Sequence, residues 1–257
     1  MTIIYPSPIF GPIQSRRLGV SLGVNLLPAD GKFCSFDCAY CECGLNEERR
    51  TKSKLPTVDE VKQGLKKQLI IMQSEGKLPD VITFAGNGEP TIHPNFLSII
   101  KNTIELRDLY APLAKVSVLT NAVHLNKESV VEALKLVDNN LLKLDTVNMD
   151  FIQRVNRPNV SYKVNNVIEN MKKFEGACII QTMFLKGSVD GVDVNNTDDK
   201  FVLPWIDAVK QIKPREVMIY TIDRETPINT LEKATKEELN RIGELLINEN
   251  IKVQISY

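Results

Sequence analysis

Three cysteines, Cys34, Cys38 and Cys41, lie close together in the spacing C-x3-C-x2-C. Three neighbouring thiols cannot all pair with one another as disulfides, but thiolates are soft ligands that can converge on an iron–sulfur cluster or a zinc ion. A four-iron cluster held by three thiolates keeps one iron open to another ligand. A closed zinc site wants four ligands, and Cys43 could be the fourth. The spacing therefore predicts a metal centre in a loop at about residues 30–44 and favours the iron–sulfur cluster.

A second group of candidate residues lies where strand-like runs end. Gly86 and Gly88 would let the backbone approach a ligand closely, and Glu89 offers a carboxylate to an ammonium group. Lys143 and Asp145 are two residues apart, so both face the same side of a strand, either as a surface ion pair or toward a ligand. In parallel α/β sheets the carboxyl ends of the strands form the site. The other strand-end candidates are Thr120, Asn121, Thr182, Met183, Tyr220 and Ile222.

Each remaining polar candidate has a structural and a functional interpretation. Arg16 and Arg17 precede the first strand, either as a solvated basic pair or as a clamp for a carboxylate or phosphate group. His93 and His124 each follow a candidate site turn, where a histidine is either structural or a proton donor. Cys178 falls within an expected strand, which predicts a place in the core.

Short β-rich runs alternate with amphipathic helical windows along the chain, which is typical of βα units and a largely parallel sheet. Thr57, with Glu60 three residues later, forms a capping box that predicts a helix start. Pro204 is expected at or next to the start of its helix, because it has no N–H to donate. Gly19 and Gly23, inside the first strand, indicate close approach by another backbone or a ligand. The expected strands are residues 18–27, 80–85, 115–119, 140–144, 177–185 and 216–222, with a closing strand at 251–256.

Six βα-like units are fewer than the eight of a standard barrel, which favours a partly open barrel. The chain has 257 residues with 43% hydrophobic and 25% charged side chains, and we expect a single domain over residues 1–257. Lys plus Arg and Asp plus Glu are both 32, so net charge gives no support for non-specific nucleic-acid binding. The chain lacks an apolar run of membrane-helix length and an export signal, and it has five cysteines, so we expect a cytoplasmic protein without a membrane partner.

Taken in order, these motifs resemble the radical S-adenosylmethionine (SAM) superfamily. The cysteine spacing, with the aromatic Tyr40 before the last cysteine, and the Gly-Glu-Pro segment after the next strand carry this resemblance. More narrowly, the chain resembles the wyosine-synthase-like Fe–S oxidoreductase family over nearly its whole length. The narrower resemblance rests on SRRLG at 15–19, SLGVN at 21–25, TFAGNGEPTIHP at 83–94, TN at 120–121, KLD at 143–145, RVNRP at 154–158 and YTIDR at 220–224.

The resemblance implies an α/β fold, namely a partial (β/α)6 radical SAM barrel with mostly parallel strands. It also implies a [4Fe–4S] cluster on Cys34, Cys38 and Cys41, with SAM chelating the fourth iron. Ala122 departs from the pattern, because the superfamily often has Gly at that position. By resemblance, Tyr40 would lie near the adenine, Gly86, Gly88 and Glu89 at the methionyl amino group, Thr120 and Asn121 at its carboxylate or the ribose, Thr182 and Met183 at the ribose or methionine, and Tyr220 and Ile222 beside the adenine.

The implied activity is reductive cleavage of SAM followed by abstraction of a hydrogen atom from a substrate that the sequence does not identify. The alternatives are activation of another enzyme by a glycyl radical, modification of a tRNA base, and modification of a small metabolite. A non-enzymatic alternative is a zinc-stabilised binding module. The expected partner is a reductant such as flavodoxin or ferredoxin. The candidates for catalytic roles are Lys143, Asp145, His93, Arg16 and Arg17.

Overall fold

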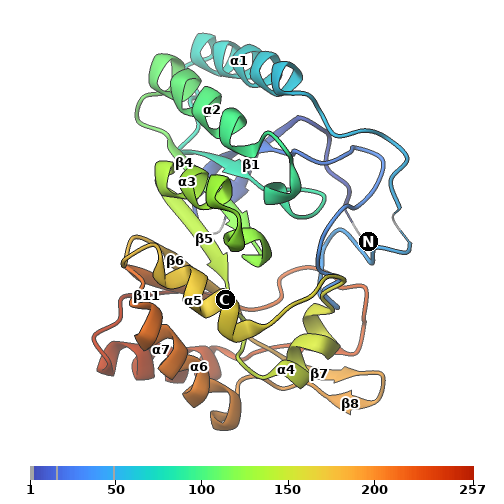
Figure 1. Ribbon diagram of the computed structural model, residues 1–257, viewed down its shortest axis with the longest axis vertical. Helices are drawn as coiled ribbons and strands as arrows, with labels where there is room; N and C mark the ends of the chain where they lie inside the picture. Colours follow the sequence, from blue (N-terminus) through green and yellow to red (C-terminus); the bar gives the residue numbers. More distant parts are fainter. Residues whose placement is uncertain (1–2, 16, 49) are drawn as a thin grey trace.

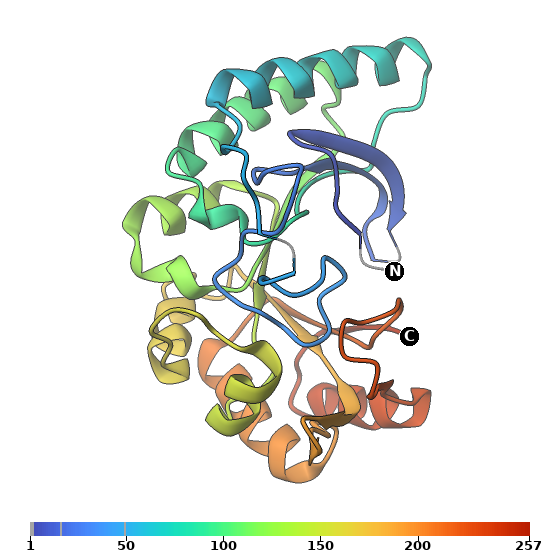
Figure 2. The ribbon, with the colours of Figure 1, turned by 90° about the vertical axis from the view of Figure 1, so that its right-hand side faces the viewer.

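The computed structural model describes residues 3–15, 17–48 and 50–257, and its centre is a curved, eight-stranded β-sheet (Figure 1). From one edge to the other, the strands are β1 (Ile9–Ser15), β2 (Gly19–Val24), β3 (Val81–Phe84), β4 (Lys115–Thr120), β5 (Asn139–Lys143), β6 (Ile179–Met183), β9 (Glu216–Tyr220) and β11 (Val253–Ser256). Neighbouring strands pair in parallel from β2 to β11, and only β1 is antiparallel to its neighbour. The sheet curls without closing, which confirms the predicted partial barrel with mostly parallel strands (Figure 2).

Helices cover the outer side of the curved sheet (Figure 2). The predicted capping box is present: the Thr57 hydroxyl accepts the backbone N–H of Glu60 at 3.2 Å, and the Glu60 carboxylate accepts that of Thr57 at 2.7 Å. The main helices are α1 (Val58–Ser74), α2 (Phe96–Tyr110), α3 (Glu128–Leu136), α5 (Val164–Lys172), α6 (Asp199–Ile212) and α7 (Lys236–Asn248). Shorter pieces are the 3-10 turns Pro90–Ile92 and Val123–Asn126, and α4 (Met149–Phe151), which continues into a π-helix, Ile152–Asn156.

The position of Pro204 differs from the prediction. Helix α6 begins at Asp199, so Pro204 lies inside the helix rather than at its start, and its side chain is exposed. A proline there removes one backbone hydrogen bond. Burial of Val202 and Trp205 on the opposite side of the helix offsets that cost, and the Trp205 indole N–H donates to the Leu144 carbonyl at 2.9 Å. Packing therefore overrides the local preference of proline.

Strand β1 is an element that the sequence did not predict. Its pairing with β2 is irregular between Phe10 and Ile13, where Gly11 and Pro12 lie. Pro12 fits this strand because β1 is at the edge of the sheet, where an N–H is not needed on the outer side. A Cβ atom on Gly23 would come within 2.2 Å of the Phe10 ring, so the close approach at that glycine is by a side chain and not by the backbone or ligand that the sequence predicted.

A small second sheet was also missed by the sequence reading. It consists of β7, β8 and β10, which pair in the order β10-β7-β8, all antiparallel. These strands are only two to five residues long, so their alternation is too short to distinguish from loop. Their bounds are Leu185–Val189 for β7, Val192–Asp193 for β8 and Leu231–Lys233 for β10.

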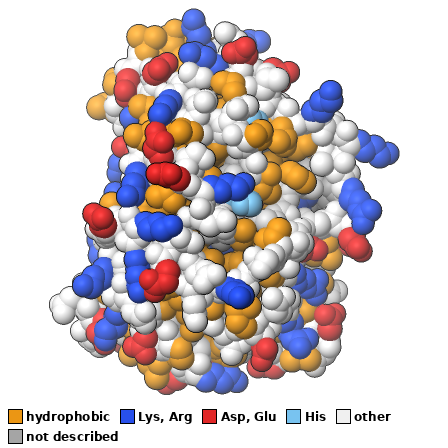
Figure 3. Space-filling model, viewed as in Figure 1, with side chains coloured by type: hydrophobic (Ala, Val, Ile, Leu, Met, Phe, Trp, Pro, Cys, Tyr) orange, Lys and Arg blue, Asp and Glu red, His pale blue; other side chains and the backbone are white. Residues whose placement is uncertain are grey.

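The surface that Figure 3 shows has interspersed basic and acidic side chains, in keeping with the balanced composition. In the part of the chain that the structure describes, no helix is both long and apolar enough to span a bilayer.

Candidate functional site

The loop that carries the three cysteines is closed by a buried lysine. The Lys32 ammonium group donates to the Asp37 carboxylate at 3.2 Å and to the Gly44 carbonyl at 2.7 Å, and its side chain is only 1% exposed. Asp37 also accepts the backbone N–H of Asn46 at 2.7 Å. The ion pair and these two hydrogen bonds together join the start of the loop to its end and fix its shape. Sequence reasoning missed Lys32, although a charged residue two positions before Cys34 was a visible signal.

Two other segments hold this loop against the sheet. The backbone N–H groups of Asp37 and Ala39 donate to carbonyls at the end of the π-helix, at 3.1 Å to Asn156 and 2.7 Å to Val155. On the other side, the loop meets Gly88, where a Cβ atom would lie 1.9 Å from the Phe33 carbonyl oxygen. Gly88 has φ +142°, so the position needs glycine both for its backbone and for this close approach.

The chemistry around the three sulfurs fits thiolate ligands. All five cysteines of the chain are free thiols in the structure. Burial raises the pKa values of Cys34 and Cys38, but N–H donors face both sulfurs and would stabilise their anionic forms. The donors are the Phe36 backbone and the Asn121 amide to Cys34, at 3.5 and 3.8 Å, and the Asn156 amide to Cys38, at 3.8 Å.

Cys41 has a neighbour of its own kind. A hydrogen bond with the Cys43 side chain lowers the pKa of Cys41, although burial opposes this shift. Cys43 is buried and donates to the Gly86 carbonyl at 3.3 Å.

Among the described residues, no three His, Cys, Asp or Glu side chains gather as ligands of a single metal ion.

Glu89 is the centre of a buried network at the ends of β3 and β4. Its carboxylate accepts the Thr120 hydroxyl and the Asn121 backbone N–H, both at 2.7 Å, and the Thr91 hydroxyl at 2.5 Å. Burial raises the pKa of Glu89, although these hydrogen bonds oppose the rise. The Asn121 amide then donates to the Ser35 hydroxyl at 2.9 Å. This network connects the predicted residues Glu89, Thr120 and Asn121 to the cysteine loop.

Lys143 and Asp145 form a buried ion pair rather than a surface one. Their side chains are 13% and 1% exposed, and the charged atoms are 3.1 Å apart. The Tyr40 hydroxyl lies between them, accepting from Lys143 and donating to Asp145. Asn156 donates to the same Asp145 oxygen at 2.8 Å. Burial would lower the pKa of Lys143, but the Asp145 carboxylate raises it above the usual value. Lys143 and Asp145 thus hold Tyr40, and with it the cysteine loop, at the end of β5.

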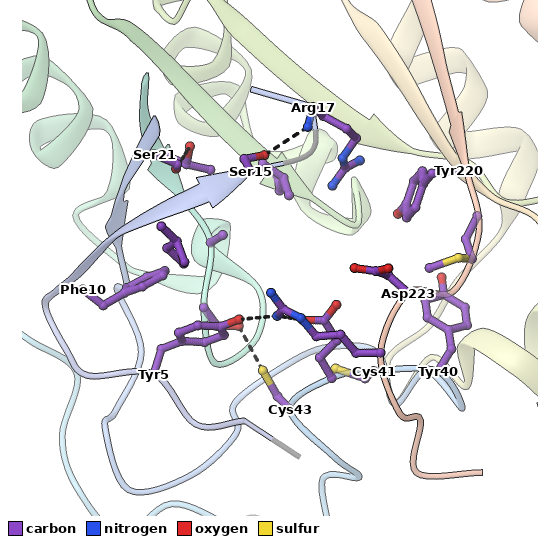
Figure 4. A pocket seen from close by; sticks show the side chains of 18 of the residues that line it. Tyr5, Phe10, Ser15, Arg17, Ser21, Tyr40, Cys41, Cys43, Tyr220 and Asp223 are labelled. Atoms are coloured by element: carbon purple, nitrogen blue, oxygen red, sulfur yellow. Dashed lines mark hydrogen bonds and ion pairs between the residues drawn. The ribbon is translucent and has the colours of Figure 1, made fainter. Parts of the chain in front are cut away.

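A cavity of about 410 Å³ opens next to Cys41 at the inner side of the half-barrel (Figure 4). The predicted site residues in its wall are Arg17, Tyr40, Cys41, Gly86, Met183, Tyr220 and Ile222. The rest of the wall comes mainly from β1 and its flanks and from the segment after β9, namely Tyr5, Phe10, Ile13, Gln14, Ser15, Ser21, Glu42, Cys43, Thr83, Ala85, Leu119, Asp223 and Arg224.

The N-terminal segment forms part of this wall because two buried amides hold it there. The Asn25 amide donates to the Tyr5 and Pro6 carbonyls at 3.3 and 3.2 Å, and the Asn87 amide donates to the Tyr5 carbonyl at 2.9 Å. Arg224 donates to the Tyr5 hydroxyl at 3.1 Å and pairs with Glu42 at 2.6 Å. These contacts join the N-terminal segment to residues far from it in the sequence, so no local sequence pattern could predict them.

Some predicted site residues lie elsewhere. Thr182 is fully buried, and its hydroxyl donates to the Leu144 carbonyl at 2.8 Å. Both ring nitrogens of His93 bond to backbone groups, at 2.8 Å to the Pro56 carbonyl and 3.2 Å to the Asn95 N–H. Arg16 lies outside the described residues.

Ala122 has a left-handed backbone, with φ 64°. That conformation explains why glycine suits this position, as the resemblance suggested.

Comparison with known proteins identifies the class to which this fold and site belong. Residues 30–191 match the model of the Radical SAM superfamily. The chain therefore belongs to the radical SAM superfamily. Members of this superfamily bind a [4Fe–4S] cluster and SAM, as predicted.

Three relatives illustrate the extent of the similarity. A UPF0026 protein of Synechocystis sp. is 31% identical over 234 residues, which cover 89% of this chain and 80% of the relative. A Brachyspira hyodysenteriae protein named GTPase Obg is 31% identical over 238 residues. The matched region covers 91% of this chain but only 32% of that protein. The crystal structure of Streptococcus suis SuiB bound to SAM has a TM-score of 0.61 and 18% identity, covering 89% of this chain and 49% of SuiB, which supports the fold alone.

Proposed function

We propose that this protein holds a [4Fe–4S] cluster on Cys34, Cys38 and Cys41, cleaves SAM reductively, and abstracts a hydrogen atom from a substrate in the adjoining cavity. The observation that carries this proposal is that the cysteine loop forms a wall of the cavity through Tyr40 and Cys41. A cofactor held by that loop would therefore face the space that receives the substrate.

The bound cluster and SAM would together supply a one-electron cleavage of the sulfonium that gives methionine and a carbon radical able to take a hydrogen atom. The chain's own residues bind and orient these groups. Glu89 would accept the methionyl ammonium group through Oε2, because Oε2 accepts only the Asn121 N–H, whereas Oε1 already accepts three donors from Thr91 and Thr120. The rings of Tyr40 and Tyr220 and the side chain of Ile222 would enclose the adenosyl group, and Lys143 and Asp145 would keep Tyr40 in position.

The size of the cavity limits the part of a substrate that can enter it. A space of about 410 Å³ that also receives SAM has room for only a small compound or a single inserted side chain or base. A reductant such as flavodoxin or ferredoxin would supply the electron. The five free thiols suit a reducing compartment such as the cytoplasm.

Anaerobic purification and reduction test this function. We expect a brown protein with about four irons per chain that forms 5′-deoxyadenosine from SAM once it is reduced. A colourless protein that binds zinc and forms no 5′-deoxyadenosine would contradict the proposal. Transfer of deuterium from a labelled candidate substrate into 5′-deoxyadenosine would then separate the metabolite, tRNA and glycyl-radical alternatives.

A further inference from the structure

The part of the cavity away from the cysteine loop contains a cation without an ion-pair partner in the described chain. Arg17 lies between β1 and β2 and lines the cavity. In residues 3–15, 17–48 and 50–257 it forms no ion pair with a carboxylate. Arg224, in the same wall, differs, because Glu42 neutralises it at 2.6 Å. Two arginines therefore share one cavity, and the described carboxylates pair with only one of them.

The Arg17 guanidinium is oriented by contacts that do not neutralise it. It lies 4.3 Å from the centre of the Tyr220 ring and points toward that ring in Figure 4. One of its N–H groups donates to the buried Gln181 side-chain oxygen at 3.4 Å, and the Gln181 amide donates in turn to the Leu141 carbonyl at 3.3 Å. Guanidinium groups have five N–H donors, so this arrangement leaves donors for a ligand.

Across the cavity from Arg17, the wall includes apolar side chains (Figure 4). The rings of Tyr5 and Phe10 pack against each other at a tilt of 34°, with their centroids 4.5 Å apart, and both line the cavity with Ile13. Asp223 also lines this wall and has an interaction of its own. A planar guanidinium beside aromatic surfaces suits an acid with an apolar body, because it binds carboxylate or phosphate oxygens in a bidentate manner.

We propose that Arg17 binds the carboxylate or phosphate group of a small substrate whose apolar body lies against Tyr5, Phe10 and Ile13. This inference rests on the proposed function, since it names the substrate class of the same cavity. It places the anionic end of the substrate at the Tyr220 side of the cavity, away from Cys41 and Cys43 (Figure 4).

Equilibrium dialysis with simple probes tests the inference on the unreduced holoprotein loaded with cluster and SAM. The probes are benzoate, phenyl phosphate and the neutral benzamide, which share an aromatic body. We expect one or both anions to bind about tenfold more tightly than benzamide, and the better of the two identifies the anionic group. Equal binding of all three probes would overturn the inference.

Matched variants locate the effect. Arg17→Met should lose the preference for the anion, Arg17→Lys should retain part of it, and Arg224→Met should retain it in full. Equal preference in Arg17→Met and wild type, or its loss in Arg224→Met alone, would overturn the assignment. If Arg17→Met does not fold, Arg17→Lys decides: a preference weaker than that of wild type supports the assignment, and an undiminished preference overturns it. Iron content and SAM binding, measured on each sample, show separately whether the proposed function itself fails.

Discussion

The cysteine loop and the part of the cavity lined by β1 and its flanks differ in how their charged side chains are paired. In the loop and at the end of β5 next to it, the chain pairs its own charges, since Lys32 is matched by Asp37 and Lys143 by Asp145. In the cavity, Arg17 is oriented by Tyr220 and Gln181 without being neutralised. The loop therefore has a fixed internal structure that a cofactor can use, whereas the cavity retains binding capacity for a ligand from outside.

The largest effect is expected from removing one thiol of the loop. Cys38→Ala should abolish both the iron content and the formation of 5′-deoxyadenosine, because the cluster loses a ligand. Iron analysis and product chromatography measure the two losses. Cys178→Ala is the matched control, since Cys178 is buried in the main core, and it should retain its iron. Normal iron in Cys38→Ala would show that Cys38 is not a ligand.

The next effect is on folding. Asp145→Asn should lower the free energy of unfolding by about 3 kcal/mol, because Lys143 becomes a buried charge without its counter-ion. Chemical denaturation measures the change. Adding Lys143→Met should recover part of the loss, and Glu132→Gln, which breaks the exposed pair with Lys101, should cost less than about 1 kcal/mol. Equal costs at the two pairs would contradict the difference in burial.

Substituting Lys32 and substituting Asp37 should each have a smaller effect, and the two should shift the midpoint potential of the cluster in opposite directions. Attraction by the three cysteines and Asp37 raises the pKa of Lys32 despite burial, so its charge lies close to the sulfurs. Lys32→Met should lower the midpoint potential of the cluster and Asp37→Asn should raise it, because a cation favours the more negative, reduced state. A tenfold change in the reduced fraction corresponds to about 59 mV. Redox titration followed by electron paramagnetic resonance measures both shifts, and shifts of the same sign would indicate a purely structural role.

The smallest effect is expected at the α1 cap, which lies outside both the cysteine loop and the cavity and therefore serves as a reference for them. Thr57→Ala should cost about 1 kcal/mol of unfolding free energy through loss of the α1 cap, without a change in iron content. The backbone hydrogen bond from Thr57 lowers the pKa of Glu60. Glu60 therefore stabilises the fold above its unfolded pKa of ~4.3, and this contribution is lost as pH falls through the lower folded value. Hydrogen exchange of the first turn of α1 should show that loss in wild type and not in Glu60→Gln.

The sequence predicted most of the parallel sheet, because each βα unit carries its own periodicity and caps. It did not predict β1, since Gly11 and Pro12 conceal a strand whose partner fixes it from outside. The start of α6 was predicted wrongly from Pro204 for a related reason, because the burial of neighbouring side chains outweighs the local preference of proline. That residues 1–257 form a single domain stays a prediction.

The candidate site divides in the same way. The cysteine spacing and the strand-end motifs are local, so a single segment indicates the cofactor. Tyr5, Glu42 and Arg224 come together only in the folded chain. The sequence shows that these residues are present, but it does not show that they contact one another. The roles of the individual cofactor-binding residues stay predictions.

The contact between Tyr5 and Arg224 joins residues 219 positions apart in the chain. A ribosome makes the N-terminal residues first, so a nascent chain has its three cysteines long before it has Arg224. During that interval, the wall that Arg224 completes is missing, and the cysteine loop is more accessible than in the finished protein. A cluster bound to this loop would be reached more easily during that interval, both by an iron donor and by oxygen.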